Sequence, residues 1–222
     1  DVSGNSNDGT ISGASWTTGV ESTSYDNSSN KSLSFDGQDD YAIVPDSDEL
    51  DGMSELTVSL DVKFKSNSYK TYTKGQVLID KWQNDVTSNS VGAYSMYTHN
   101  DENNLSFTIQ TQSNQHKGVN INLDDVELNK WYNIVGRYDG ERVEIYLDGK
   151  LKANKDASGN VKQNSYPLEI GYQTNSKTKF FHGNIDNVAI WDKALSVDEI
   201  TSLYNNGNTK SASIINSGNL KA

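Results

Sequence analysis

The chain has 222 residues, 33% of them hydrophobic, and a formal net charge of -11 at pH 7. This acidic balance argues against nucleic acid and anionic membrane surfaces as partners, because both require a basic protein surface, and it favours cations. The absence of cysteine excludes disulfides and thiol chemistry. No stretch approaches the roughly 20 apolar residues that span a bilayer, and no cleavable signal opens the chain. We therefore expect no membrane insertion, and a piece linked to other domains of a larger chain.

Short strands dominate the sequence pattern. From Leu56 to Phe64 apolar and polar residues alternate strictly, which is typical of a strand with one buried face. Similar alternations recur at 33–35, 41–44, 77–82, 93–98, 105–111, 119–123, 131–138, 143–147, 168–172 and 185–191. Ten or more strands separated by turn residues predict two packed antiparallel sheets in one domain.

The alternation also predicts which side chains fill the space between the sheets. The expected core residues are Leu56, Val58, Leu60, Val62, Val135, Val143, Ile145 and Ile185. Trp131 and Trp191 lie within strand patterns and are also expected in the core, whereas Trp16 has no clear assignment. Asp148-Gly149 separates two apolar runs and tolerates the positive φ angles of a tight type I′ hairpin.

A single segment carries the signals of a helix. Ser196 and Glu199 form a capping box, Ile200 and Leu203 follow at helical spacing, and Gly207 can close the end. This pattern predicts a two-turn surface helix.

Several phrases, in a fixed order, are similar to those of one known family. They are DVSGNSNDGT (1–10), LSFDG (33–37), DDY (39–41), the strand 56–64, WYNIV (131–135), YDG (138–140), the run 143–149, GNIDNV (183–188) and ALS (194–196). Together they resemble the laminin G-like and pentraxin-like jelly rolls of the concanavalin A-like lectin/glucanase superfamily. The resemblance covers about residues 1–207 and implies an all-β, two-sheet antiparallel jelly-roll sandwich with one short C-terminal surface helix.

One departure concerns the two ends of the chain. Members of the resembled family carry a further strand just before the segment that begins this sequence. Either that strand lies outside the sequence, or Ile214 and Ile215 fill the vacant edge, which would otherwise invite aggregation. The polar tail over 208–222 is therefore either a frayed linker or a late edge strand.

The first ten residues are rich in oxygen donors of the kind that Ca²⁺ prefers. In the resembled family this loop holds a structural calcium together with the Asp of the late Gly-x-Ile-Asp strand, which corresponds to Asp186. The resemblance thus implies Ca²⁺ as a cofactor, with Asp1, Asn5, Asn7, Thr10 and Asp186 as its ligands. The alternative is that the Asn, Asp and Gly cluster is simply a solvated turn.

The sequence offers no recognisable catalytic constellation. Glucanases of the superfamily place two or three carboxylates on one strand face, and the nearest approach here, Glu141 to Glu144, adjoins a hairpin turn and is expected to be solvated charge. The three histidines are scattered, without the spacing of a zinc site. We therefore predict that the chain is not an enzyme.

Aromatic residues in polar loops predict where a sugar binds, because aromatic faces stack on C–H surfaces while amides and carboxylates bind hydroxyls. Trp82 ends a strand and begins a polar loop, so its ring either lies at an exposed rim or caps the core. The candidate ligand-binding residues are Tyr72, Trp82, Asn84, Asp85, Tyr97, His99 and Asp101.

These observations predict a calcium-stabilised, extracellular carbohydrate-binding module, secreted or displayed on a cell surface, that belongs to a larger bacterial adhesin or carbohydrate-active protein. The expected partner is a glycan or glycoprotein. Two alternatives remain open, a structural spacer that binds no specific ligand and a divergent glycosidase.

Overall fold

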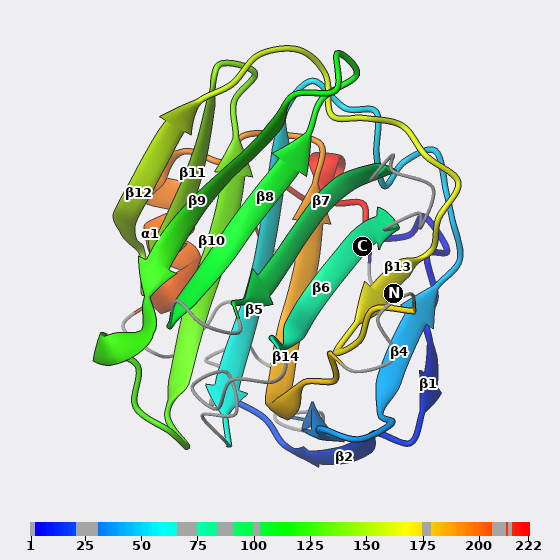
Figure 1. Ribbon diagram of the computed structural model, residues 1–222, viewed down its shortest axis with the longest axis vertical. Coiled ribbons are helices and arrows are strands. Elements are labelled where there is room, and N and C mark those ends of the chain that lie inside the picture. The colour runs from blue at the N-terminus through cyan, green and yellow to red at the C-terminus, as the bar shows by residue number, and fades with distance from the viewer. Residues whose placement is uncertain are drawn as a thin grey trace.

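The computed structural model describes residues 3–20, 31–65, 75–83, 91–99, 103–174, 179–205, 212 and 215–222. Within them, two antiparallel sheets of seven strands each pack face to face (Figure 1). The predicted all-β sandwich is therefore confirmed.

The front sheet, which faces the viewer in Figure 1, has the strand order β1-β4-β13-β6-β7-β8-β9. Its strands are β1 (Thr10–Ser12), β4 (Tyr41–Val44), β13 (Leu168–Ile170), β6 (Val77–Gln83), β7 (Val91–Thr98), β8 (Asn104–Gln110) and β9 (His116–Asn122).

The back sheet has the order β12-β11-β10-β5-β14-β3-β2. Its strands are β12 (Lys150–Asp156), β11 (Arg142–Leu147), β10 (Trp131–Tyr138), β5 (Leu56–Phe64), β14 (His182–Trp191), β3 (Lys31–Asp36) and β2 (Ser15–Thr18). Three described strands had no predicted counterpart, namely β1, β2 and β12. All three are edge strands with mostly exposed side chains, so they lack the alternation by which the other strands are recognised.

The apolar core lies between the sheets and contains seven of the eight predicted residues: Leu56, Val58, Leu60, Val62, Val143, Ile145 and Ile185. The prediction for Val135 is wrong. Its neighbour Ile134 points into the core, and because side chains alternate along a strand, Val135 points to the outer face of the back sheet.

The outer face of the back sheet carries a second apolar cluster, here called the back cluster, beneath helix α1 (Val197–Tyr204) (Figure 1). Its buried members are Val135, Tyr146, Ala189, Trp191, Leu195, Ile200, Leu203, Ile215 and Leu220. Trp191 is fully buried, as predicted, but in this cluster rather than between the sheets. Trp131 is not a core residue, since it is half-buried with the Lys63 ammonium 4.8 Å from its ring centroid.

The last residues of the chain join the back sheet. The backbone N–H of Lys221 donates to the carbonyl oxygen of Ile190 (2.7 Å), and the N–H of Ile190 donates to that of Ala222 (2.9 Å). Strand β5 follows the other side of β14, and β3 pairs with β14 only over residues 182–185. The tail therefore occupies the stretch of β14 that β3 leaves open. Ile214 lies outside the described residues.

The predicted local motifs are present. Ser196 caps α1, its hydroxyl accepting from the N–H of Glu199 while the Glu199 carboxylate accepts from the N–H of Ser196. The helix ends at Asn205 in the left-handed conformation (φ 41°), whereas the predicted terminator Gly207 lies outside the described residues. Asp148 and Gly149 both have positive φ (51° and 72°), as the hairpin requires.

The expectation of solvated charge at Glu141 to Glu144 is wrong for Glu144. This side chain is buried on the outer face of the back sheet, and its Oε2 lies 2.6 Å from Nη1 of Arg137 and 2.8 Å from the Tyr146 hydroxyl that donates to it. The sequence pattern did not predict the pairing of Glu144 with Arg137, because these residues lie on neighbouring strands.

Among the described residues, no helix is long and apolar enough to cross a membrane.

Candidate functional site

The outer face of the front sheet carries a row of polar side chains that strand pairing brings together. Asp80 on β6 is the register partner of Glu169 on β13 and of Ser95 on β7, and Ser95 in turn is the partner of Thr108 on β8. Directly paired residues have Cβ atoms about 4.5–5.5 Å apart. Four residues that are distant in the sequence thus lie side by side across four strands.

Irregular pairing between β6 and β7 determines which side chains face outward. The register shifts between Val77 and Ile79, and again between Asp80 and Trp82. In a regular strand Val77 and Asp80 would point to opposite faces, but both line the same outer cavity. Such irregularities re-aim side chains, and they are common next to functional sites.

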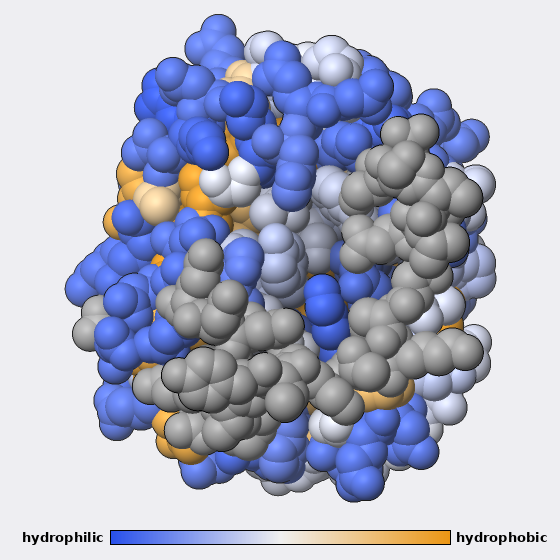
Figure 2. Space-filling view, viewed as in Figure 1, coloured by the Kyte–Doolittle hydropathy of each residue, from blue (hydrophilic) through white to orange (hydrophobic). Residues whose placement is uncertain are grey.

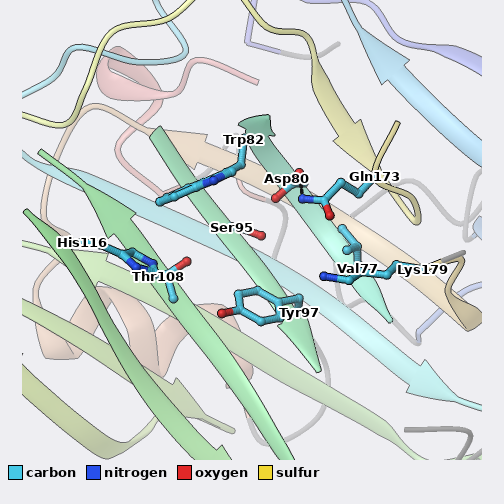
Figure 3. A pocket seen from close by; sticks show the side chains of 9 residues that line it. All are labelled: Val77, Asp80, Trp82, Ser95, Tyr97, Thr108, His116, Gln173 and Lys179. Carbon is cyan, nitrogen blue, oxygen red and sulfur yellow. Dashed lines mark hydrogen bonds between the residues drawn. The ribbon is translucent and has the colours of Figure 1, made fainter. Parts of the chain in front are cut away.

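These side chains surround a cavity of about 120 Å³, here called the front cavity. This is several times the roughly 10–15 Å³ that one water molecule requires. The visible face of the front sheet is hollowed near its middle, where hydrophilic and intermediate residues gather (Figure 2). The described residues that line the cavity are Val77, Asp80, Trp82, Ser95, Tyr97, Thr108, His116, Gln173 and Lys179 (Figure 3).

Trp82 forms one wall of the front cavity. Its ring lies so close to the backbone of β7 that a Cβ atom at Gly92 would be 1.9 Å from it, so only glycine fits there. Its centroid is 5.0 Å from that of His116. The indole is 8% exposed, yet it belongs to neither apolar cluster. Of the two predicted alternatives, an exposed ring at a rim and a ring that caps the core, neither describes Trp82 fully, because its ring is buried but lies on the outer face of the front sheet.

Tyr97 forms the opposite wall and connects to further polar residues. Its ring centroid is 5.0 Å from that of His99 and 5.7 Å from the Lys179 ammonium. Nε2 of His99 lies 2.6 Å from the Ser106 hydroxyl, which donates to Asn120 (2.7 Å). His99 thus supports Tyr97 from outside and does not itself line the cavity.

Asp80 is the most electrostatically perturbed residue at the site. Burial raises the pKa of its carboxyl group to about 8, against the opposing effects of the Ser95 and Gln173 side chains. The Gln173 amide donates to Oδ2 (2.9 Å), whereas the buried Oδ1 accepts no hydrogen bond. The group is therefore mostly protonated at neutral pH, with one polar atom unsatisfied.

Glu169, beside Asp80 in the row, has a different role. Burial raises its pKa to about 7, and its carboxylate accepts hydrogen bonds from the backbone N–H and the hydroxyl of Thr174. It does not line the front cavity. Glu169 therefore holds the chain that follows β13, from which Gln173 reaches Asp80.

The structure brings Trp82 and Tyr97 of the predicted ligand-binding set to one cavity and places His99 against Tyr97. The other four predicted residues, Tyr72, Asn84, Asp85 and Asp101, lie outside the described residues. Sequence reasoning did not select Asp80, Ser95, Thr108, His116, Gln173 or Lys179. One signal was available, since Asp80 interrupts an otherwise apolar strand beginning Val77-Leu78-Ile79.

The predicted calcium ligands are only partly brought together. Asn7 and Asp186 line one hollow, whereas Asn5 and Thr10 do not, and Asp1 lies outside the described residues. The Asn5 amide donates to the carbonyl oxygen of Leu220 (2.9 Å), and the Asn7 amide to that of Lys221 (2.7 Å). The N-terminal loop therefore binds the C-terminal tail.

The Asp186 carboxylate already has partners within the protein. Its oxygens accept from the backbone N–H groups of Val20 (2.9 Å) and Asn187 (2.8 Å), and burial raises its pKa. Calcium takes six to eight oxygen ligands. Among the described residues, Asn7, Asp186 and the adjacent Asp8 offer oxygen atoms to the same hollow.

This second hollow, of about 450 Å³, lies at the sandwich edge where β1 and β2 end the two sheets. Its lining is mainly apolar and includes Trp16, which is 60% exposed. Elsewhere, the carboxylates of Asp36, Asp39 and Asp40 lie within 4.8 Å of one another, and Asp40 accepts from the N–H of Asp36. The latter cluster stabilises its own turn.

The solved structures with a similar fold include the binding domains of two toxins. The binding domain of Paraclostridial Mosquitocidal Protein 1 has a TM-score of 0.70 and 15% identity, with 93% of this chain and 49% of that one covered. The receptor binding domain of botulinum neurotoxin D has a TM-score of 0.67 and 16% identity, with the same coverage. The present chain thus spans about half the length of these neighbours.

A third neighbour contains a sugar. The botulinum neurotoxin serotype D ligand binding domain in complex with N-acetylneuraminic acid has a TM-score of 0.61 and 16% identity, with 87% of this chain and 46% of that one covered. At such low identity the likeness establishes the fold alone, and it does not place that sugar on this chain. No curated protein matches the sequence. A family profile, in contrast, matches residues 36–201, which is more than half of the chain, and the chain therefore belongs to the concanavalin A-like lectin/glucanases superfamily, in its laminin G branch.

Proposed function

We propose that the chain is a carbohydrate-binding module and that the front cavity is its binding site. The observation that carries the proposal is the cavity itself, in which two aromatic rings, Trp82 and Tyr97, lie on opposite sides of hydroxyl, amide and carboxyl groups on the outer face of the front sheet (Figure 3). Sugar sites in proteins combine apolar surfaces with a few convergent polar groups.

The lining suggests how a sugar ring is held. The half-buried ring of Tyr97 offers a face on which the C–H groups of a sugar ring can stack, and the indole of Trp82 bounds the cavity on the opposite side. Ser95 and Thr108 present hydroxyls, which both donate and accept hydrogen bonds. The orphan Oδ1 of Asp80 gains a partner when a ligand hydroxyl replaces water, and an unsatisfied buried group is costly enough to make this exchange favourable.

We propose binding without hydrolysis. Retaining glycosidases require two carboxyl groups about 5 Å apart on either side of the scissile bond. Among the described residues that line the front cavity, Asp80 alone carries a carboxyl group, while Glu169 is held by Thr174 outside it. The site therefore favours the binding module over the divergent glycosidase.

The proposal extends to the setting of the module. A glycan or glycoprotein partner and a place within a larger extracellular protein agree with neighbours that are binding domains, of which this chain spans about half the length. A secreted or cell-surface location follows from that role and is part of the same proposal.

Calcium remains a proposal, with its ligands revised. We propose that Asn7, Asp8 and Asp186 hold the ion at the second hollow and that it stabilises the contact between the N-terminal loop and the C-terminal tail. An ion bound only by the folded chain adds about 2.7 kcal/mol of stability at a hundred times its dissociation constant.

The binding proposal is tested on a glycan array with the wild type, Tyr97→Ala and Trp82→Ala. We expect both variants to lose at least about tenfold in affinity, because each removes an aromatic wall. Trp16→Ala is the matched control, as it removes an exposed ring at the other hollow. Loss of binding in the control alone would move the site to the second hollow, and silence of the wild type on the array would favour the structural spacer.

The calcium proposal is tested by thermal melting with and without a chelator. The wild type is expected to melt lower after chelation, whereas Asp186→Asn should be less stable and insensitive to calcium. Asp36→Asn, in the other acidic cluster, should still respond as the wild type does. If the wild type melts at the same temperature with and without the chelator, the calcium proposal is wrong.

A further inference from the structure

Resting on the proposed function, we infer that the front cavity selects a sugar that carries a carboxylate, which binds the Lys179 ammonium and accepts a hydrogen bond from the Asp80 carboxyl group. This inference narrows the ligand from carbohydrate in general to acidic sugars. It rests on one cation, one buried acid and their surroundings.

Lys179 places its ammonium group at the front cavity. It lines the front cavity, and its nitrogen points toward the middle of the cavity from the side opposite His116 (Figure 3). Its nitrogen lies 5.7 Å from the centroid of the Tyr97 ring, and its charge acts on the Asp80 carboxyl group, whose pKa it lowers against the larger effect of burial. No described carboxylate forms an ion pair with it, although acidic residues outnumber basic ones by 30 to 19 in this chain.

The Asp80 carboxyl group is able to donate to an anion. It is fully buried, and Oδ1 has no hydrogen-bond partner while Oδ2 accepts from Gln173. Because burial raises its pKa to about 8, the group is mostly neutral below that pH and carries a proton. A ligand carboxylate placed between Asp80 and Lys179 would therefore meet a donor on one side and a cation on the other.

The other groups around Asp80 add little negative charge at the cavity. On β9, the pKa of His116 is lowered by burial against its neighbours and by Lys155, so the ring is neutral near pH 7. On β13, the pKa of Glu169 is raised to about 7, so this group is about half ionised at pH 7, but it lies outside the lining of the cavity. Ser95 on β7 and Gln173 beyond β13 are uncharged. The lining therefore carries a net positive charge near neutral pH in a protein whose overall charge is -11.

A neutral sugar would use this arrangement less well. It would displace water from a half-buried ammonium without supplying a counter-charge. Hydrogen bonds to a charged partner are also stronger than those between neutral partners. A carboxylate supplies the charge and fills the empty acceptor position opposite the protonated Asp80. The chemistry of the cavity thus favours the acidic sugar.

The test compares D-glucuronate with D-glucose, D-galacturonate with D-galactose, and N-acetylneuraminate with its methyl ester, by titration calorimetry at pH 6.5. We expect the wild type to bind the acidic member of at least one pair tenfold or more tightly. Lys179→Gln should remove most of that preference, so that the acidic and neutral members of the pair bind with similar affinities. Lys63→Gln is the matched control, because Lys63 also lies over an aromatic ring but on the back sheet.

A pH series separates the role of Asp80 from that of Lys179. Between pH 6.5 and 9 the wild type should lose affinity for the acidic sugar, because Asp80 ionises, ceases to donate and repels the ligand. Asp80→Asn keeps a donor at this position at every pH, so its affinity should be nearly constant. Glu169→Gln, which removes the other carboxyl group that titrates in this range, should retain the wild-type loss.

The outcomes distinguish this inference from the proposed function beneath it. Equal affinity for acidic and neutral sugars, abolished by Tyr97→Ala, would overturn the selection of carboxylates and leave the carbohydrate site in place. A preference for acidic sugars that survives Lys179→Gln would also overturn it. Binding of none of these probes, together with silence on the glycan array, would overturn both.

Discussion

The two sheets are built from strands with the same alternating pattern, but their outer faces carry different side chains. On the back sheet, Trp191 and Val135 are covered by α1 and the C-terminal tail, so this face is a second apolar core. On the front sheet, Asp80 and Ser95 line the front cavity, which none of the described helices covers. Where a described helix covers an outer face, buried apolar side chains extend the core, whereas the front sheet carries polar side chains around a cavity that we propose as a binding site.

Buried acids on the two outer faces differ in the same way. On the back sheet, Asp61 accepts from the amides of Asn133 (2.9 Å) and Asn187 (2.8 Å), one to each carboxylate oxygen. On the front sheet, Asp80 has one satisfied oxygen and one without a partner. An unsatisfied buried polar group requires an explanation, and for Oδ1 of Asp80, which adjoins the front cavity, we propose a ligand.

The largest expected effect separates the two tryptophans of these faces. Trp191→Ala should lower the free energy of unfolding by about 3–5 kcal/mol, because it empties the back cluster and removes the hydrogen bond from its indole to the Ile215 carbonyl. Trp82→Ala should cost clearly less, since its ring borders a cavity. Urea denaturation measures both, with the exposed Trp16→Ala as a control near zero. Equal costs for Trp191 and Trp82 would contradict the division into a structural and a binding face.

A smaller effect concerns the pH dependence of stability. The folded chain holds a proton on Asp80 up to a pKa of about 8, whereas the unfolded chain releases it near 3.8. Stability from this group is therefore complete below pH 4 and is lost as the pH rises toward 8. Asp80→Asn should remove this loss, so its drop in stability between pH 4 and 8 should be smaller than that of the wild type by more than about 1.4 kcal/mol, the equivalent of one pKa unit.

The measurement is urea denaturation of both proteins at each pH. Asp61→Asn, on the back sheet, is the comparison variant, because it removes a carboxylate whose two oxygens already have amide donors and should therefore destabilise the fold at neutral pH. A wild type and an Asp80→Asn variant with parallel pH profiles would show that Asp80 is ionised in the folded chain.

The smallest expected effect tests the cover of the back sheet. Ser196→Ala removes the hydroxyl that caps α1 and should cost about 1 kcal/mol. Because α1 covers only the back sheet, sugar affinity at the front cavity should not change. Thermal melting and calorimetry read the two quantities separately. A loss of sugar affinity in this variant would mean that the two outer faces are coupled through the core.

Much of the fold could be predicted because its signals are local. The alternation from Leu56 to Phe64, the capping box at Ser196 and the Asp148-Gly149 turn each depend on a few neighbouring residues, and all three are present. The edge strands escaped prediction because exposed strands carry no apolar alternation. Val135 was misplaced because a valine in a strand does not reveal which of two apolar faces it meets.

The candidate site was predicted only in part. Trp82 and Tyr97 are visible in a sequence as aromatic residues near polar loops, and their strands bring them to one cavity. Asp80, Gln173 and Lys179 belong to separate segments whose proximity depends on the pairing of β6 with β7 and β13. The N-terminal loop, predicted to bind calcium, likewise forms hydrogen bonds with the C-terminal tail, whose residues lie more than 200 positions away in the sequence.

The sequence by itself determined the class of architecture, since strand periodicity, turn residues and caps are written into successive residues. The tertiary structure alone decided which outer face is covered and which buried acid lacks a partner. The reason is physical. The register between strands and the packing of α1 set the surroundings of each side chain, and those surroundings determine whether Asp80 carries a proton at neutral pH while Asp61 is held by two amides.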